Sequence, residues 1–367
     1  MKTTKIAIIG IGAISGIYLE NLTSLFQQVE IIGVCDLIVE RAKKAIADYR
    51  IPKLYLTMEE AFADEEVEII LNLTRPYEHY AVTKAALLAG KHVYSEKPLA
   101  ATISEGEELV ALAKAKQLAL GGAPDTFLGA ALQTCRKLID DGFIGEVVGF
   151  HAAMLCRGHE SWHPDPAFYY QFGGGPMMDM GPYYLTALTN LLGRVESVMA
   201  VAKKTFATRT ITSQPQQGQT IEVDVPTYLS GILTFENGVI GNLTTTFDVV
   251  SNQQAHLEIY GSKGSLRVPD PNFFGEKIYL LRSETPEYKE IPLLFDYQEN
   301  SRGLGLADMA QALKENRPIR ANVSQTFHVL EVMTAFVRSS ENEAKEVITS
   351  SFERAAPMKA ADVLGVL

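Results

Sequence analysis

The sequence is poor in cysteine and has no excess of basic residues. Its three cysteines, Cys35, Cys135 and Cys156, form no C-x-x-C pair, so neither a disulfide framework nor a cysteine-based zinc site is indicated. Lys and Arg number 33 against 44 Asp and Glu, and the formal net charge of −11 gives no broad basic surface for nucleic acid. We therefore expect a cytoplasmic protein that does not bind nucleic acid.

Long hydrophobic runs are also missing. No segment reaches the roughly 18 uninterrupted apolar residues of a membrane span. The stretch MKTTKIAIIGIGAISGIYL resembles a signal peptide, but Glu20 and Asn21 lead directly into a patterned helix and then a second strand. We predict no membrane association, and the 367 residues, 47% of them hydrophobic, suffice for two domains.

Strand and helix patterns alternate through the first third of the chain. Apolar runs such as KIAIIG are typical of strands covered on both faces. Strands are expected at 5–10, 29–36, 67–74, 91–96 and 118–122, and helices at 13–26, 38–49, 77–90 and 103–117. This alternation predicts an α/β fold, with a doubly wound parallel sheet of the Rossmann type over residues 1–123 and ligands at the carboxyl ends of its strands.

The turn after the first strand reads GIGAISG, with glycines at Gly10, Gly12 and Gly16. Ser15 stands where the usual dinucleotide fingerprint has its third glycine, and a small residue suffices there for close helix packing. Such a turn lets the backbone approach a pyrophosphate and leaves the helix N-terminus free for negative charge. We expect cofactor contacts from the turn residues Gly10, Gly12, Ala13 and Ile14.

Asp36 ends the second expected strand. A carboxylate there can accept hydrogen bonds from both hydroxyls of an adenosine ribose and would repel a 2′-phosphate. This favours NAD as the cofactor, while the nearby Arg41 leaves a role for NADP open. The alternative is that Asp36 only caps the helix that starts near Val39.

The pattern changes after residue 123. A helix and a glycine turn lead from residue 128 into a first strand, and further strands with turn punctuation follow, including a hairpin signal at Asn237-Gly238. Helical stretches at 303–316 and 324–340 close the chain. Residues 124–367 are predicted to form an α+β domain with a largely antiparallel, open sheet.

Three blocks of sequence now resemble one family. The glycine turn, the stretch LNLTRPYEHYAVTKAALLAGKHVYSEKPLA and the downstream GGGPMMDMGPYYLTALTNLLG occur in the order found in the glucose-fructose oxidoreductase / inositol dehydrogenase superfamily (Gfo/Idh/MocA). The resemblance implies an NAD(P)-dependent oxidoreductase acting on a sugar, a polyol or a related compound such as a dihydrodiol. It also implies a homodimer or homotetramer formed through the open face of the C-terminal sheet.

By this resemblance, Lys97 matches the lysine of the family's E-K-P motif, which lies beside the nicotinamide and hydrogen-bonds the reacting oxygen. Glu96 matches the neighbouring glutamate at the cofactor, and Pro98 matches a proline that is often cis. A second region of the family lies along the nicotinamide half of the cofactor, and it matches Thr74, Pro76 and His79. His79 is equally compatible with a satisfied polar residue in the first turn of a helix.

In many family members a presumed acid/base histidine follows an aspartate by four residues, but here Asp179 is followed by Tyr183. Hydride transfer from an alcohol leaves a proton that a positioned acid/base takes up. A free tyrosine has a pKa of about 10, and a nearby ammonium favours its phenolate. We therefore expect Tyr183 to act as acid/base, with Lys97 supplying the charge.

Asp179 and Tyr183 share one side of a helix expected to be entered through Pro182. Asp179 would then orient the catalytic pair or contact a substrate hydroxyl. The alternatives are that Asp179 is only the N-cap of this helix and that Tyr183 only packs in the core.

The segment CRGHESWHPDPAFYYQFGGG gathers aromatic, histidine and acidic residues ahead of Asp179. Rings stack on sugar faces while hydroxyl groups need donors and acceptors, so we predict that Trp162 and His163 line the substrate pocket. The alternatives are an oligomer contact, or a metal site built from His159, His163 and Asp165. The family is not generally metal-dependent, and we expect no metal.

Asp125 is a further candidate for the substrate pocket, because it lies where the chain leaves the nucleotide domain. Two functions from different classes follow from these residues. The first is an oxidoreductase in which Lys97 polarises the reacting oxygen and Tyr183 transfers the proton. The second is a dinucleotide-binding regulatory or sensor protein without turnover, in which Tyr183 is structural.

Overall fold

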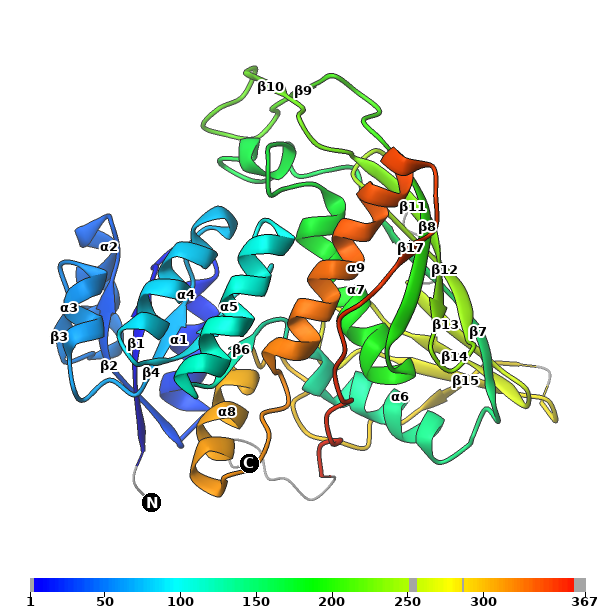
Figure 1. Ribbon diagram of the computed structural model, residues 1–367, viewed down its shortest axis with the longest axis horizontal. Helices are drawn as coiled ribbons and strands as arrows, with labels where there is room; N and C mark the ends of the chain where they lie inside the picture. The colour runs from blue at the N-terminus through cyan, green and yellow to red at the C-terminus, as the bar shows by residue number, and fades with distance from the viewer. Residues whose placement is uncertain (1–2, 251–255, 286, 360–367) are drawn as a thin grey trace.

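The structure, a computed structural model, describes residues 3–250, 256–285 and 287–359. Figure 1 shows a small sheet and a large sheet with helices packed between them, the N-terminal half in blue and cyan and the larger sheet in green and yellow. Within the described residues, none of the helices combines the length and apolar character needed to cross a membrane.

The N-terminal sheet has the predicted parallel, doubly wound topology. All its strand pairs are parallel, and their order is β3-β2-β1-β4-β5-β6. The strands are β1 (Thr4–Ile9), β2 (Val29–Cys35), β3 (Lys53–Leu54), β4 (Ile69–Asn72), β5 (His92–Ser95) and β6 (Leu120–Gly122). The short edge strand β3 is an addition to the sequence prediction.

Helices follow the strands on both faces of this sheet. Local chemistry defines some of their ends: Thr102 and Glu105 form a capping box, and Thr57 caps the short helix after β3. The helices are α1 (Ser15–Ser24), α2 (Val39–Tyr49), α3 (Met58–Ala63), α4 (His79–Leu88) and α5 (Ile103–Lys116), with a 3-10 turn η1 (Pro76–Glu78) before α4.

The second sheet is largely antiparallel, as predicted. Its order is β16-β15-β14-β13-β7-β12-β11-β8-β17, and β7 and β12 form a parallel pair. The strands are β7 (Val147–Leu155), β8 (Val195–Lys203), β11 (Tyr228–Phe235), β12 (Ile240–Thr246), β13 (Leu257–Gly261), β14 (Gly264–Val268), β15 (Ile278–Arg282), β16 (Lys289–Ile291) and β17 (Glu346–Val347). The predicted hairpin joins β11 to β12 through Gly238, whose φ is +85°.

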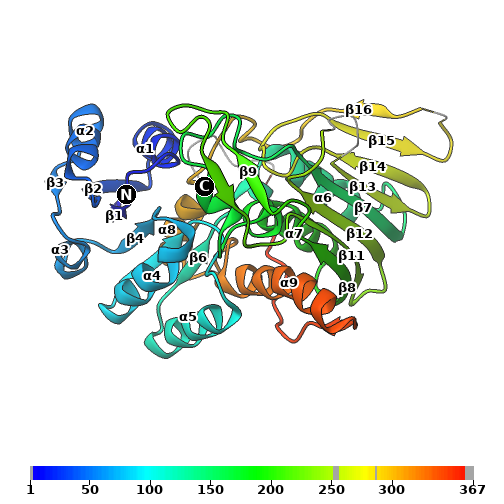
Figure 2. The same ribbon diagram turned by 90° about the horizontal axis from the view of Figure 1, so that it is seen from above.

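Helices cover one face of the large sheet and separate it from the Rossmann domain. Figure 2 shows α6, α7 and α9 on this side, and α8 beside the Rossmann strands. They are α6 (Ala130–Asp140), α7 (Pro176–Leu192), α8 (Leu304–Glu315) and α9 (Val323–Asn342), with 3-10 turns η2 (Thr126–Leu128) and η3 (Ala167–Tyr170). A separate small ribbon, β9 (Thr208–Thr210) with β10 (Thr220–Glu222), lies above α7 in Figure 1.

The start of α7 corrects one expectation. The helix begins at Pro176 after Gly175, so Pro182 lies inside it and Asp179 is a first-turn residue, not the N-cap. An interior proline removes a backbone hydrogen bond and frees carbonyl groups in the turn before it. The carbonyl of Asp179, in that turn, accepts a hydrogen bond from the Lys97 ammonium. This contact links α7 to the Rossmann domain.

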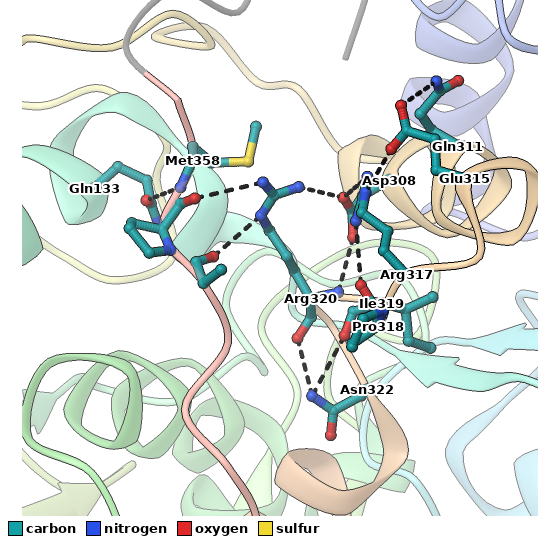
Figure 3. Close-up of polar contacts among 12 residues, drawn as sticks. Gln133, Asp308, Gln311, Glu315, Arg317, Pro318, Ile319, Arg320, Asn322 and Met358 are labelled. Atoms are coloured by element: carbon teal, nitrogen blue, oxygen red, sulfur yellow. Dashed lines mark hydrogen bonds and ion pairs between the residues drawn. The ribbon is translucent and has the colours of Figure 1, made fainter.

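A buried ion cluster joins α8 to the C-terminal segment (Figure 3). Asp308 accepts from Arg317 at 2.7 Å and from Arg320 at 2.5 Å, both on its Oδ1 atom. The other edge of the Arg320 guanidinium donates to the carbonyls of Ala356 and Pro357. These contacts fasten the end of the described chain across the helical layer.

The other face of the large sheet carries exposed apolar side chains. Cross-strand neighbours Met199 and Ile232 are both more than half exposed. The exposed apolar residues of these strands are Val148, Met199, Val201, Ile232 and Ile240. We call this surface the open face.

Candidate active site

Three parallel strands end side by side at one edge of the Rossmann sheet. The register pairs Ile9 of β1 with Asn72 of β4, and Asn72 with Ser95 of β5. The segments that follow these strands therefore leave the sheet at the same edge, where ligands bind in this architecture. All three segments carry predicted site residues.

The turn after β1 is shaped for close approach. Gly10 has φ of +99°, and a Cβ there would lie 2.7 Å from the carbonyl oxygen of Leu73, so only glycine fits. Gly12 and Ala13 are exposed. Ile14 stands at the N-cap of α1, where its apolar side chain leaves the first N–H groups of the helix available to an anion.

Asp36 orders this turn from the end of β2. One carboxylate oxygen accepts from the N–H of Ile11 at 2.6 Å, and the other from the N–H of Ile38 at 2.7 Å. The contact with Ile38 forms a turn ahead of α2, whose N-cap residue is Ile38 and which has no side-chain cap, so the capping role of the alternative interpretation is not observed. An ionised carboxylate has about four acceptor sites, so these two contacts leave capacity for ribose hydroxyls.

His79 ties the segment after β4 to the segment after β5. Its Nδ1 lies 2.7 Å from the carbonyl oxygen of Pro98 and its Nε2 lies 3.0 Å from that of Thr74. Burial lowers the pKa of His79, and the two carbonyls act in the opposite direction. Pro76 starts η1 beside them. The cofactor contacts of Thr74, Pro76 and His79 stay predictions.

Glu96 holds the start of the E-K-P segment. It is buried, and its carboxylate accepts from the Tyr18 hydroxyl at 2.7 Å and from the N–H of Lys97 at 2.9 Å. The bond between Lys97 and Pro98 is cis, as the resemblance implied. These contacts position the backbone from which the Lys97 side chain extends.

The Lys97 side chain reaches across to α7. Its Nζ donates to Oδ1 of Asp179 at 2.9 Å and to the Asp179 carbonyl at 2.8 Å, while Oδ2 of Asp179 lies 3.0 Å from Nε2 of His159. Burial disfavours both charges, but their pairing prevails. The pKa of Lys97 is raised, and Lys97 and His159 hold the pKa of Asp179 well below its usual range.

Tyr183 lies one helical turn beyond Asp179, between two cations. Lys97 Nζ is 5.2 Å from the centroid of the phenol ring, and Arg302 donates to the hydroxyl at 3.5 Å. Asn272 holds Arg302 in place, with its side-chain oxygen 2.6 Å from the guanidinium.

The aromatic segment before α7 lies next to this cluster. The His159 ring packs against Trp162 and Tyr169, with ring centroids 5.3 and 4.1 Å apart, and His163 lies 5.3 Å from Trp162. Trp162 is 60% exposed. The structure thus brings Trp162 and His163 close to Asp179 through His159, and their contact with a substrate stays a prediction.

The metal alternative receives no support from these residues. His159 faces Asp179, and His163 accepts the backbone N–H of Asp165 at 3.0 Å. Throughout the part of the chain that the structure describes, no three or more His, Cys, Asp or Glu side chains are grouped to hold a metal ion.

Asp125 lies beneath the site. It is 1% exposed, and one carboxylate oxygen accepts from the N–H groups of Gly303 and Gly305 at 2.9 and 3.0 Å. Burial raises the pKa of Asp125 to about 6. Its observed contacts support the loop that carries Arg302, and its role toward a substrate stays a prediction.

The sequence patterns did not predict the place of two residues in this site, His159 and Arg302. His159 was considered only as a metal ligand, although its place in an aromatic segment before Asp179 was a usable signal. Arg302 is a single arginine in a loop far along the chain, and no local pattern marks it.

The geometry fits a dinucleotide. Gly10 packs too closely against the backbone of Leu73 for a Cβ, a Cβ at Gly12 would meet no atom within 4 Å, and Asp36 offers a carboxylate at the end of β2. These features match the pyrophosphate and ribose requirements of a Rossmann domain.

Comparisons with known proteins agree with this geometry. The family described as "Oxidoreductase family, NAD-binding Rossmann fold" matches residues 4–122, and the "GFO/IDH/MocA C-terminal domain" matches residues 132–267. Among solved structures, levoglucosan dehydrogenase in complex with NADH superposes with a TM-score of 0.82 at 19% identity, over 95% of this chain and 100% of that one.

Curated relatives show the same family. An uncharacterized oxidoreductase of Schizosaccharomyces pombe is 33% identical over 43% of this chain and 42% of its own length. Trans-1,2-dihydrobenzene-1,2-diol dehydrogenase of Bos taurus is 27% identical over 72% of each chain. The chain spans about half the length of the first two curated relatives that it matches. On both domains, the chain belongs to the Gfo/Idh/MocA family of NAD-binding oxidoreductases.

Proposed function

We propose that the protein is a dehydrogenase that transfers a hydride between NAD and the CH–OH carbon of a sugar, a polyol or a related cyclic diol. One observation carries the proposal: the Lys97 ammonium lies 5.2 Å from the centroid of the Tyr183 ring. Lys97 follows β5, which ends at the same edge of the sheet as β4. A hydrogen-bond donor and a proton acceptor are the two groups that alcohol oxidation needs.

The charges assign the two roles. Because the pKa of Lys97 is raised, its ammonium stays protonated and acts as the donor that polarises the reacting oxygen. Tyr183 then receives the proton. Bound NAD would accept the hydride from the C–H bond of the substrate, and Tyr183 would take up the O–H proton, so that a carbonyl compound would remain. Asp179 orients Lys97 and lies within reach of a neighbouring hydroxyl.

Asp36 supports NAD as the preferred cofactor. Its carboxylate is fixed by two backbone N–H groups at the place where a 2′-phosphate would add negative charge. Arg41 is exposed on α2 and leaves NADP as a weaker alternative. Gly10, Gly12, Ala13 and Ile14 would hold the pyrophosphate, and Thr74, Pro76, His79 and Glu96 would flank the nicotinamide half.

Substrate recognition falls to Trp162, His163 and Asp125 with the catalytic residues. An exposed ring beside histidines suits a polyhydroxylated or cyclic diol substrate, and the bovine relative is named for a cyclic diol. Direct contact by Asp125 would require movement of the loop that now covers it.

The open face supports assembly into a homodimer or homotetramer, since contiguous apolar side chains on a sheet mark an interaction surface. The three cysteines are all free, which suits the reducing cytoplasm.

A screen of sugars, polyols and dihydrodiols tests the proposal by absorbance at the nicotinamide band. Tyr183→Phe should lower kcat by about 10²- to 10⁴-fold, since it removes the proton acceptor. Tyr184→Phe is the matched control: the adjacent hydroxyl bonds His256 away from the site, and its loss should leave kcat unchanged. Cofactor binding without turnover of any substrate would favour the sensor function instead.

A further inference from the structure

Asp179 is shared between two basic side chains from different parts of the fold. Lys97 comes from the end of β5, and His159 from the segment after β7; they contact opposite oxygens of the carboxylate at 2.9 and 3.0 Å. The three side chains are 17%, 12% and 15% exposed for Lys97, His159 and Asp179. The cluster is therefore sheltered, yet reachable from the site.

The hydrogen-bond inventory fixes the direction of each contact. An ionised carboxylate only accepts, so the Nε2 of His159 must carry a proton. An ammonium has three N–H groups, and within the described part of the chain Asp179 supplies two acceptors to Lys97, its Oδ1 and its carbonyl oxygen. The orientation of Asp179 thus decides where the third N–H of Lys97 points.

The His159 ring is itself held rigidly. Phe247, fully buried, packs against it with centroids 4.7 Å apart, in addition to the contacts with Trp162 and Tyr169. The next residue, Glu160, is anchored by Arg209 at 3.3 Å. A ring fixed on several sides places its Nε2–H at a defined point.

We propose that His159 is a positioning residue of the reaction: its Nε2–H fixes the carboxylate of Asp179 and thereby aims the Lys97 ammonium at the reacting oxygen. This inference rests on the proposed function. It differs from a packing role because the N–H group, and not the ring, carries the effect. It differs from a substrate contact because the effect passes through Asp179 to Lys97.

Two substitutions of His159 separate the effect of its ring from the effect of its N–H group. His159→Phe keeps a ring but leaves Oδ2 of Asp179 without its donor, so the carboxylate turns toward Lys97 and the ammonium loses its aim. A displacement on the scale of 1 Å lowers rate by about 100-fold, and we expect that loss in kcat. His159→Gln places an amide N–H near the former Nε2, and should recover kcat to within about tenfold of wild type.

His163 provides the matched control on the same segment. Its Nδ1 accepts a backbone N–H, and its contacts do not include Asp179. His163→Phe and His163→Gln should therefore change mainly the KM of the substrate, with no recovery of kcat specific to glutamine. Equal kcat for His159→Phe and wild type, or no advantage of His159→Gln over His159→Phe in folded enzyme, would overturn the proposal. Thermal unfolding of each variant establishes that it is folded.

A second readout does not depend on turnover. ¹⁵N NMR of imidazole-labelled protein with saturating NAD, assigned by the signal lost in His159→Gln, reports which ring nitrogen carries a proton. A proton on Nε2 supports the contact with Asp179, and an unprotonated Nε2 overturns it. If the wild type oxidises no substrate, the proposed function fails, while this spectrum still decides the position of His159.

Discussion

Two aspartates, Asp179 in the candidate active site and Asp308 in the scaffold, each hold two basic side chains, but in different ways. Each carboxylate sits between two basic side chains from other segments. Asp308 is fully buried, and Arg320 divides its donors between Asp308 and the carbonyls of the C-terminal segment (Figure 3). Asp179 is paired with a lysine and a histidine instead and keeps 15% of its side chain exposed.

The two clusters differ in whether the basic side chains keep an N–H donor that the cluster does not use. Arginine offers a planar fork that stays charged and can satisfy several fixed acceptors at once, which suits a joint that should not change. Lysine is a compact charge on a flexible stem, and Lys97 has one more N–H group than Asp179 provides acceptors for. The Asp308 cluster therefore fixes a joint of the scaffold, whereas the Asp179 cluster leaves one N–H group of Lys97 that Asp179 does not bind.

The largest expected effect is the loss of activity in Lys97→Met. Removing the ammonium that we propose to polarise the reacting oxygen should lower kcat/KM by about 10³-fold. Because His159 still contacts Asp179, the variant should fold and bind NAD. Steady-state kinetics beside a cofactor titration by fluorescence would measure both. Activity near that of wild type would mean that the cluster around Asp179, like the one around Asp308, has only a structural role.

Asp308→Ala should show the opposite pattern. It removes a fully buried carboxylate, which leaves Arg320 without its ion pair and Arg317 with Glu315 alone, and breaking such a cluster costs about 3–5 kcal/mol. Urea unfolding should report this loss in the free energy of unfolding, while the kcat of the folded fraction stays within about twofold of wild type. A large fall in kcat without a fall in stability would contradict the division between scaffold and site.

The sequence anticipated the parts of this comparison that depend on local pattern. Alternating strands and helices predicted the parallel sheet, and the position of Lys97 after β5 placed it at the ligand-binding edge. The edge strand β3 was missed because two residues, Lys53 and Leu54, carry no periodicity. The start of α7 was misplaced because Pro182 looks like a helix boundary, although the helix begins at Pro176 and continues through Pro182.

Contacts between distant segments were beyond any local pattern. His159 meets Asp179 only because the segment after β7 folds back over α7, and Arg302 meets Tyr183 only because the loop before α8 is held by Asp125 and Asn272. Such pairings are set by tertiary packing, so residue spacing does not encode them.

His328, a histidine of the scaffold, tests the difference between scaffold and site through the pH dependence of stability. His328 on α9 accepts the N–H of Val195 on its Nε2, at 3.1 Å, and its Nδ1 bonds the Ser350 hydroxyl at 2.8 Å. Burial lowers its pKa to about 4, because a proton on Nε2 would face the Val195 N–H. Burial therefore holds this ring neutral.

The sign of the effect follows from proton uptake. Between about pH 4 and 6.5, His328 binds a proton in the unfolded chain but not in the folded protein. The free energy of unfolding is therefore highest above about pH 6.5 and decreases as the pH falls toward 4. The change amounts to about 3 kcal/mol over that window. His328→Gln should flatten the dependence in urea unfolding at stepped pH; an unchanged slope would show that other groups control it.

The smallest effect on stability is expected when one kind of cation replaces the other in the scaffold. Arg320→Lys should lower the free energy of unfolding by about 1–2 kcal/mol, since a point charge can hold Asp308 but not also the carbonyls of Ala356 and Pro357. Lys97→Arg keeps the charge in the cleft, yet its wide fork cannot present a single donor at the same place, so activity should fall nearly as far as in Lys97→Met. Urea unfolding and kinetics on both variants would show whether charge alone, or the shape of the donor, distinguishes the scaffold from the site.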